Sequence, residues 1–279
     1  MGGHGTSGGP KVLQGSAVRI RRRIPRGEKI VLGIVPIVAI LALWTLFTTG
    51  TVEERVISST ILPSPMEVVG AVGSLWFQAE LSRSIVASFS RVLLGFAVAF
   101  LIAFPLGIAM GAWSRVRALF EPLSVFGSYL PIPALVPLTM SMFGIGEMQK
   151  IMFLGLAFLI YLLPLIVKAV DEVDDVYLQT AYTMGATQWQ TVRHVLFSVA
   201  APQIVQAMRM GFGIGWTYII LAEMVAADRG LGQIIIIAQR RGPREHIYLV
   251  LLVIVLIAYL TDRLWVYLAR NLFPYREAK

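Results

Sequence analysis

Five ionisable residues of this chain lie within or beside long apolar stretches, where charge is difficult to accommodate. They are Arg91, Arg209, Glu223, Asp262 and Arg263. Ionisable groups at membrane depth are costly and are usually paired or in contact with water. Arg209 and Glu223 fall in one apolar stretch, but a helix would separate them by about 21 Å, so they cannot pair within one chain. We expect Arg209, Asp262 and Arg263 to extend toward a membrane surface instead.

Glu223 is the hardest of these charges to explain, because it follows Trp216, Thr217 and Tyr218 in the same apolar stretch. A carboxylate in this position could gate or line a path for a solute. It could equally be a structural partner for a neighbouring helix or loop. Both interpretations stay open, and we take Trp216 and Glu223 as candidate residues of a translocation path.

The other reactive residue types argue against an enzyme. The chain has no cysteine, which excludes disulfides, thiolate metal sites and cysteine nucleophiles. Of its three histidines, His194 and His246 are predicted on opposite sides of a membrane, and His4 lies in a Gly- and Ser-rich segment. A glycine-rich phosphate loop is also missing from the sequence, so the chain is not itself an ATPase. We expect no catalytic residue, no metal site and no cofactor bound by this chain.

Composition indicates that the elements carrying these residues are membrane helices. Hydrophobic residues make up 57% of the 279 residues and charged residues only 14%, and mean hydropathy is +0.74. A soluble domain is about a quarter charged. The apolar residues gather into runs that cross or nearly cross a bilayer, because about 20 such residues span its core. The predicted fold is all-α and polytopic, with six helices at 30–48, 86–112, 119–142, 149–170, 200–226 and 247–269.

The net charge of +8 predicts the orientation of these helices. Lysine and arginine gather in the segments that a cytoplasmic N-terminus would place inside, as short cytoplasmic loops require, so both termini are predicted to be cytoplasmic. The basic residues flank apolar runs instead of forming one stripe, so the expected surrounding is lipid and not nucleic acid. The predicted parts are a disordered basic segment 1–29, a transmembrane domain 30–270 containing an inner loop 171–199, and a cytoplasmic tail 271–279.

Prolines interrupt the third predicted helix. Pro131, Pro133 and Pro137 remove amide donors and clash with the preceding turn, so this helix must be kinked or interrupted. Broken backbone at membrane depth is tolerated where it lines a cavity or is buried in protein. A path-lining role and a purely structural kink are both open, and Pro131 and Pro133 join the candidate path residues. In the fifth helix, Gly211 and Gly215 prepare a close helix contact that would suit an interface between subunits.

Two outer segments are long for a helical bundle. Segment 62–78 begins with prolines and continues with apolar residues at helical spacing, which predicts a helix lying at the membrane surface. Segment 227–246 carries four arginines against the usual distribution of positive charge. Two of them, Arg240 and Arg241, are candidate contacts for an external partner or for an anion.

The inner loop 171–199 is the most informative segment. Short helices are predicted at 172–183 and 187–198, and Gly185 permits the turn between them. Each helix has an apolar face, formed by Tyr177, Ala181 and Met184 in the first and by Trp189, Val192 and Leu196 in the second. Such faces in a water-exposed loop either pack on the same bundle or dock on a partner.

At this loop the chain resembles the membrane permease subunits of ABC importers. Their cytoplasmic signature is a Glu-Ala-Ala run followed by a glycine and, further on, an Ile-x-Leu-Pro run. Here Gln179, Thr180 and Ala181 stand for the first run, Gly185 for the glycine, and Val195, Phe197 and Ser198 for the last. The glutamate of the signature is therefore replaced by Gln179, which either takes over its polar role or leaves that role unfilled. Similarity to the nitrate, sulfonate and taurine branch extends over 60–270, in Ile61–Pro65, Ser88–Phe96, Leu130–Leu138, Phe143–Glu147, Ala222–Met224 and Gly230–Gly232.

The resemblance implies a type I permease fold in a bacterial inner membrane. It also implies an assembly of two permeases, here expected to be two copies of this chain, with two cytoplasmic ATPases and an external substrate-binding protein. A heterodimer of permeases stays open. ATP and Mg²⁺ would be bound by the ATPases. The residues expected to couple this chain to the ATPase are Tyr177, Gln179, Thr180, Ala181, Gly185 and Trp189, with Ala181 close to the partner's backbone.

The external contacts and the substrate are implied more coarsely. Arg240 and Arg241 would meet the binding protein. Members of the family import small anions such as nitrate, sulfonates or bicarbonate, and others carry aromatic or heterocyclic nutrients. An ATP-independent secondary transporter is the alternative, although such proteins often contain repeated halves and the sequence has no internal repeat.

Overall fold

The computed structural model describes residues 24–50, 55–77, 79–225 and 228–276, and every regular element among them is a helix. Five helices are long and apolar enough to cross a membrane, and a sixth span results if one bent pair is counted as one. The all-α polytopic prediction is confirmed. In chain order the elements are α1 (Arg26–Thr48), α2 (Pro65–Gly70), α3 (Val72–Phe77), α4 (Leu81–Ala112), α5 (Ser114–Ser128), η1 (Ile132–Ala134), α6 (Leu135–Phe143), α7 (Glu147–Asp171), α8 (Asp175–Thr183), α9 (Gln188–Gln190), η2 (Thr191–Leu196), α10 (Phe197–Met224), α11 (Leu231–Arg241), α12 (Arg244–Leu272) and η3 (Pro274–Arg276).

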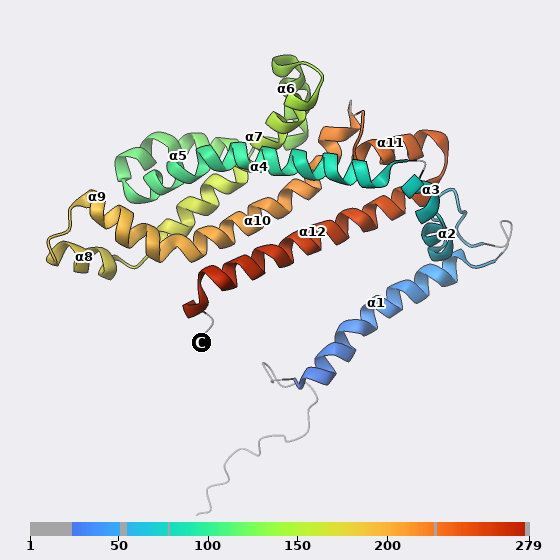
Figure 1. The fold of residues 1–279 in the computed structure, drawn as a ribbon, viewed down its shortest axis with the longest axis horizontal. Coiled ribbons are helices and arrows are strands. Elements are labelled where there is room, and N and C mark those ends of the chain that lie inside the picture. The colour runs from blue at the N-terminus through green and yellow to red at the C-terminus, as the bar shows by residue number, and fades with distance from the viewer. Residues whose placement is uncertain (1–23, 51–54, 78, 226–227, 277–279) are drawn as a thin grey trace, which may run out of the picture.

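Three long helices, α4, α7 and α10, form the core of the bundle (Figure 1). Glycines allow their backbones to approach closely. A Cβ at Gly215 of α10 would lie 2.2 Å from Cζ of Phe158 in α7, and one at Gly107 of α4 would lie 2.7 Å from Cγ2 of Ile166. The glycine face of α10 therefore packs inside the chain. Its predicted use as an interface between subunits is wrong, because sequence spacing shows that a face is small but not which helix covers it.

The third predicted helix is interrupted. α5 ends at Ser128, the 3-10 turn η1 follows, and α6 begins at Leu135, with a bend of 93° between the two pieces. Pro131 precedes η1 and Pro133 lies within it. Figure 1 shows α6 rising away from the helices of the bundle. The sequence therefore located the break, and the structure gives its angle.

The fifth span begins earlier than predicted. α9 and the π-helical turn η2 continue without a break into α10, so one helix of 37 residues runs from Gln188 to Met224. Its start is marked by a capping box, in which Thr187 and Gln190 bond each other's backbone amides. The segment predicted as a separate helix at 187–198 is thus the first part of the fifth span. Hydropathy misplaced this boundary because the leading turns are largely polar.

The predicted surface helix in segment 62–78 forms as two short helices, α2 and α3. A capping box between Ser64 and Glu67 begins α2, and Val68 and Leu75 are buried against the bundle. α1 lies apart from the bundle in Figure 1 and is held near its C-terminal end, where Trp44 Nε1 donates to the carbonyl of Pro63 at 2.9 Å. These contacts join the first span to the end of the molecule that carries α11.

The predicted terminal segments lie partly outside the described residues. Of the segment 1–29, the structure describes residues from 24 onward, and α1 already begins at Arg26, so the prediction of disorder is wrong for its last four residues. Of the tail 271–279, the structure describes residues up to 276. There η3 follows α12.

Candidate functional site

A network of ion pairs joins α4, α7 and α10 at the end of the bundle that carries α11, called here the α11 end. Arg91 of α4 is buried and donates from Nε and Nη2 to the two carboxylate oxygens of Glu147 in α7, at 2.6 and 2.7 Å. Its Nη1 donates to Glu223 of α10 at 2.6 Å. Lys150 Nζ donates to Glu147 at 3.0 Å. One arginine therefore ties three helices together.

Glu223 also holds the first residues of α11. Its side chain accepts from the Ser88 hydroxyl at 2.7 Å and from the Gly232 amide at 2.9 Å. Ser88 in turn accepts from the Leu231 amide at 2.9 Å. Gly230 has a φ of +144°, and a Cβ there would lie 2.4 Å from Cδ of Glu223. The backbone passes so close to the carboxylate that a glycine is required.

The charges of this network balance. Arg91 and Lys150 face Glu147 and Glu223, so each charge within it has a partner, as buried ions require. Glu223 is 1% exposed and Trp216 is 3% exposed within the single chain. As placed, neither side chain faces an open path. The path role of Trp216 and Glu223 stays a prediction, and the contacts of Glu223 fit the structural alternative.

Arg209 and Asp262, each predicted to extend toward a membrane surface, pair with each other. Their position relative to a membrane surface stays a prediction. Arg209 of α10 donates from Nε and Nη2 to the carboxylate of Asp262 in α12, at 2.5 and 2.9 Å. Cζ of the adjacent Arg263 lies 4.8 Å from the centre of the Tyr259 ring, within cation–π range. The pairing of Arg209 with Asp262 could not be predicted from the sequence, because the two residues are 53 positions apart.

Pro131 and Pro133 lie where the third span bends, and both are exposed on the surface of the single chain. Ile132 between them is buried. Their path role stays a prediction, because it depends on what covers this surface in the assembly.

At the other end of the bundle, called here the α8 end, α8 packs against η2. Ala181 is 7% exposed and faces the interior of its own chain, whereas Met184 is 83% exposed. Tyr177, Gln179 and Thr180 are also exposed. The predicted common face of Tyr177, Ala181 and Met184 is therefore wrong, and Ala181 is not free to approach a partner's backbone. The reason is that η2 covers the side of α8 that carries Ala181.

Gly185 makes the predicted turn after α8. Its φ is +83°, and a Cβ would find no atom within 4 Å, so the backbone conformation alone favours glycine. Beyond the turn, the Trp189 ring stacks on Trp113 at the junction of α4 and α5, with ring centres 6.5 Å apart. Exposed apolar side chains remain on both sides of Gly185. We call them the α8 surface: Tyr177, Tyr182, Met184 and Trp189.

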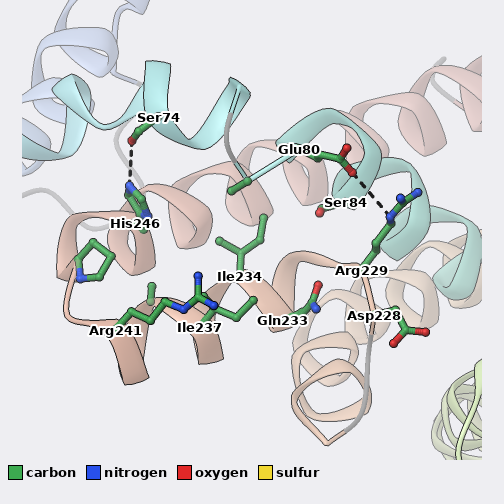
Figure 2. Close-up of a pocket in the computed structure, with 13 residues that line it drawn as sticks. Ser74, Glu80, Ser84, Asp228, Arg229, Gln233, Ile234, Ile237, Arg241 and His246 are labelled. Atoms are coloured by element: carbon green, nitrogen blue, oxygen red, sulfur yellow. Dashed lines mark hydrogen bonds and ion pairs between the residues drawn. The ribbon is translucent and has the colours of Figure 1, made fainter.

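An open pocket of about 390 Å³ lies at the α11 end, between α3, α4, α11 and the start of α12 (Figure 2). On one side Arg229 reaches Glu80 at 3.6 Å. On the other side His246 Nε2 lies 2.9 Å from Ser74 Oγ, and Arg241 lies beside them. The pocket therefore presents charged and polar groups around the apolar side chains of α11.

The two candidate contact arginines differ in their surroundings. Both side chains are exposed, but Arg241 lines the pocket and Arg240 does not. Neither forms an ion pair or hydrogen bond with any residue that the structure describes. Both lie in the last turn of α11, where positive charge is favourable for a helix. This helix was not predicted, although Gly230 before it and Gly242 after it bound an amphipathic stretch.

Residues 103–274 match the family described as binding-protein-dependent transport system inner membrane component. The match covers more than half of the chain. The chain belongs to this family. It is a multi-pass inner-membrane permease of an ABC importer, and the resemblance drawn from the loop 171–199 is confirmed.

Curated relatives agree over nearly the whole length. The taurine transport system permease protein of Escherichia coli K12 is 31% identical over 92% of this chain and 94% of that protein. A probable ABC transporter permease of Brucella abortus 2308 is 31% identical over 84% of this chain and 91% of that protein. The nitrate import permease of a Synechocystis strain is 23% identical over 88% of this chain and 90% of that protein.

The fold has a solved counterpart in the methionine ABC transporter MetNI in an inward-facing conformation. That chain matches with a TM-score of 0.64 and 21% identity, over 72% of this chain and 98% of its own length. The match confirms the predicted importer permease fold.

Membership in the family decides between the function classes. The chain is a transport subunit and not an enzyme, and its partners include an ATPase and a substrate-binding protein. The comparisons give no support to the secondary-transporter alternative. The described residues contain no group of three or more potential metal ligands, and the expectation that this chain binds no metal stays a prediction.

Most members of the two sites at the α11 end could not be recognised from the sequence. Arg91 and Glu223 stand out there as costly charges but not as a pair, and nothing in the sequence marks Ser88 or Lys150. A signal was present, because the predicted orientation places Arg91 and Glu223 near the outer ends of two spans and therefore at similar depth. The pocket had no such signal, since its lining residues come from four separate helices.

Proposed function

We propose that this permease carries a small anion of the sulfonate or nitrate class, together with a second copy of itself. The relatives named for taurine, aliphatic sulfonates and nitrate support the substrate class, because all three solutes are small and carry an oxyanion group. An external binding protein delivers the solute, and a pair of cytoplasmic ATPases binds ATP and Mg²⁺. This chain binds no cofactor.

The α8 surface is the observation that carries the proposal. Met184 is 83% exposed and Trp189 is 62% exposed at one end of the bundle. Apolar side chains gathered beside polar ones commonly mark a contact with another protein. The α8 end is therefore cytoplasmic and docks on the ATPase through α8 and the Gly185 turn. With this orientation both termini are cytoplasmic.

The bend of the third span supports a second copy. Between Ser128 and Leu135 the backbone leaves the α-helical pattern, and Pro131 and Pro133 are exposed there. Irregular backbone facing lipid is unfavourable, so this surface needs a protein neighbour or a water-filled path. A homodimer provides both, with Pro131 and Pro133 beside the path.

The arginines of α11 support contact with the binding protein at the outer surface. Neutralising Arg240 and Arg241 together should lower uptake at low substrate concentration and make the uptake less sensitive to salt, because steering by charge weakens with ionic strength. Unchanged uptake with an unchanged salt response would leave these arginines as solvated charges.

Reconstitution tests the proposal as a whole. Proteoliposomes containing the permease, its ATPase and ATP should accumulate radiolabelled taurine, an alkanesulfonate or nitrate only when the binding protein is present outside. Native mass spectrometry of the same particles should find two copies of this chain. Uptake without ATP, or full activity from particles with one permease copy, would contradict the proposal.

A further inference from the structure

We propose that the pocket at the α11 end receives an acidic side chain of the external binding protein, with Arg241 as its pairing residue. The inference rests on the proposed function, because it specifies how the binding protein is held. It assigns different roles to the neighbouring residues Arg240 and Arg241, for which the sequence predicts the same contact.

Arg241 is the charge in the pocket that is available for an incoming carboxylate. Arg229, the other arginine of the wall, is engaged by Glu80 at 3.6 Å. Figure 2 shows Glu80, Arg229 and Asp228 on one side and Arg241 with His246 on the other. Among the described residues Arg241 has no hydrogen-bonding or ionic partner. A guanidinium prefers a carboxylate, which it can bind through two parallel hydrogen bonds.

The walls around Arg241 are held in place before any partner arrives. The hydrogen bond between His246 and Ser74 joins α12 to α3 across one side of the pocket. The first amides of α11 are fixed by Ser88 and Glu223, so this helix is tied to the core of the bundle. A preorganised site loses less conformational freedom on binding and therefore holds its partner more tightly.

The pocket is better suited to an anchoring group than to a travelling solute. α11 forms part of its lining, and the first amides of that helix are bonded to the buried side chains of Ser88 and Glu223. A free solute leaving the pocket toward these residues would have to break that buried network, which also includes Arg91. A volume of about 390 Å³ accommodates a side chain with its surrounding water.

The pocket is also connected to that network through Arg229. The side chain of Arg229 lines the pocket, and its carbonyl accepts a hydrogen bond from Nη1 of Arg91 at 2.6 Å. A side chain bound beside Arg241 would thus lie in a pocket whose opposite wall is bonded to the residue joining α4, α7 and α10.

The test measures the affinity of the cognate binding protein for the assembled permease–ATPase complex in nanodiscs, at low and at physiological salt. Arg241→Gln should weaken binding at least about tenfold at both salt concentrations, because it removes one partner of a close charge pair. Arg240→Gln, the matched control, should weaken it less than about threefold, mainly at low salt. Gln233→Trp keeps the charge but fills the pocket, and should also weaken binding about tenfold. Each variant is first required to match the wild type in thermal unfolding.

Several outcomes would overturn the inference. Equal losses for Arg241→Gln and Arg240→Gln, both removed by salt, would show a diffuse field instead of a pocket. Unchanged binding-protein affinity, together with an Arg241-dependent binding of free taurine or ethanesulfonate in the absence of the binding protein, would show a solute site. If the binding protein failed to bind the wild-type complex, the proposed function itself would fail, whereas loss of the Arg241 effect alone would remove only the pocket.

Discussion

The α11 end and the α8 end of this bundle differ in how side chains that are unfavourable in their surroundings are accommodated. At the α11 end, Arg91, Lys150, Glu147 and Glu223 satisfy one another within a single chain. At the α8 end, large apolar side chains such as Met184 stay exposed beside polar loop residues. The ion-pair network at the first end is completed within the chain, whereas the α8 surface presents groups that another protein would cover.

This difference indicates where the subunit is rigid and where it depends on partners. Charges inside a bundle must find partners during folding, since an unpaired buried ion destabilises the chain by several kcal/mol. Exposed apolar groups cost much less in a monomer and become favourable when a partner covers them. Mutations at the α11 network should therefore act on folding, while mutations on the α8 surface should act on assembly.

Arg91→Ala is expected to have the largest effect, because it leaves Glu223 buried without its cation. Breaking a buried pair costs about 3–5 kcal/mol. Membrane abundance and the unfolding temperature in detergent should both fall. Arg117→Ala is the matched control, since Arg117 pairs with Glu121 and Asp171 at the surface, and exposed pairs contribute about 1 kcal/mol or less. Equal losses in the two variants would contradict the distinction between the ends.

Adding Glu223→Gln sharpens this comparison. The amide keeps an acceptor for the Gly232 amide while removing the charge, so the double variant Arg91→Ala with Glu223→Gln should be more stable than Arg91→Ala. A double-mutant cycle measures the coupling directly. No recovery in the double variant would mean that Arg91 acts mainly through Glu147.

Ala181→Trp should come next, and its effect should be on folding. The side chain is covered by its own chain, so added volume would force α8 away from η2 at a cost of about 1–3 kcal/mol. Membrane abundance should fall. Retained abundance with lost ATPase copurification would instead place Ala181 against the ATPase, as the sequence analysis predicted.

Gly185→Val should separate presentation of the loop from folding of the bundle. A branched residue at φ +83° is strained by roughly 1–2 kcal/mol, yet no neighbouring atom obstructs it. We expect near-normal membrane abundance with weak ATPase copurification. Gly185→Asn, which tolerates left-handed backbone better, should retain more of the association. If Val and Asn behave alike, the positive φ is not what the contact requires.

Met184→Asp should weaken ATPase association about tenfold without changing the unfolding temperature, because it places an unpaired carboxylate in an apolar contact. Asp175→Asn, at the start of α8, should leave association unchanged. Titration of the ATPase onto immobilised permease measures both. A fall in the unfolding temperature for Met184→Asp would show that the α8 surface packs within the chain.

The smallest effect is expected at Glu67, in the short helix α2. The hydrogen bond from Arg55 and the backbone amide of Ser64 lower the pKa of Glu67 from its ordinary value of 4.5. Because the folded pKa is the lower one, this contribution is fully present above the ordinary pKa and is lost as the pH falls below it. Glu67→Gln should remove that part of the acid destabilisation, seen as an unfolding temperature that falls less steeply as the pH drops below about 4.5. An unchanged slope would contradict it.

The sequence predicted the break in the third span and the turn at Gly185 correctly because both depend on local chemistry. Pro131 and Pro133 disrupt a helix wherever it lies, and glycine favours a positive φ without long-range help. The partners of Arg91 could not be predicted in this way, because they are 56 and 132 residues away in the chain. The buried position of Ala181 also depended on the early start of the fifth helix.

The sequence by itself determined that this chain is a helical membrane permease, because hydropathy, the distribution of charge and the family's loop pattern are properties of consecutive residues. The tertiary structure decided which glycine-bearing faces of α4, α7 and α10 are buried and which carboxylate pairs with each arginine. It also decided that Arg241, but not Arg240, borders a pocket. The physical reason is that these features arise where separate helices meet. Their relative rotation and depth come from packing the whole bundle, and no single segment encodes them.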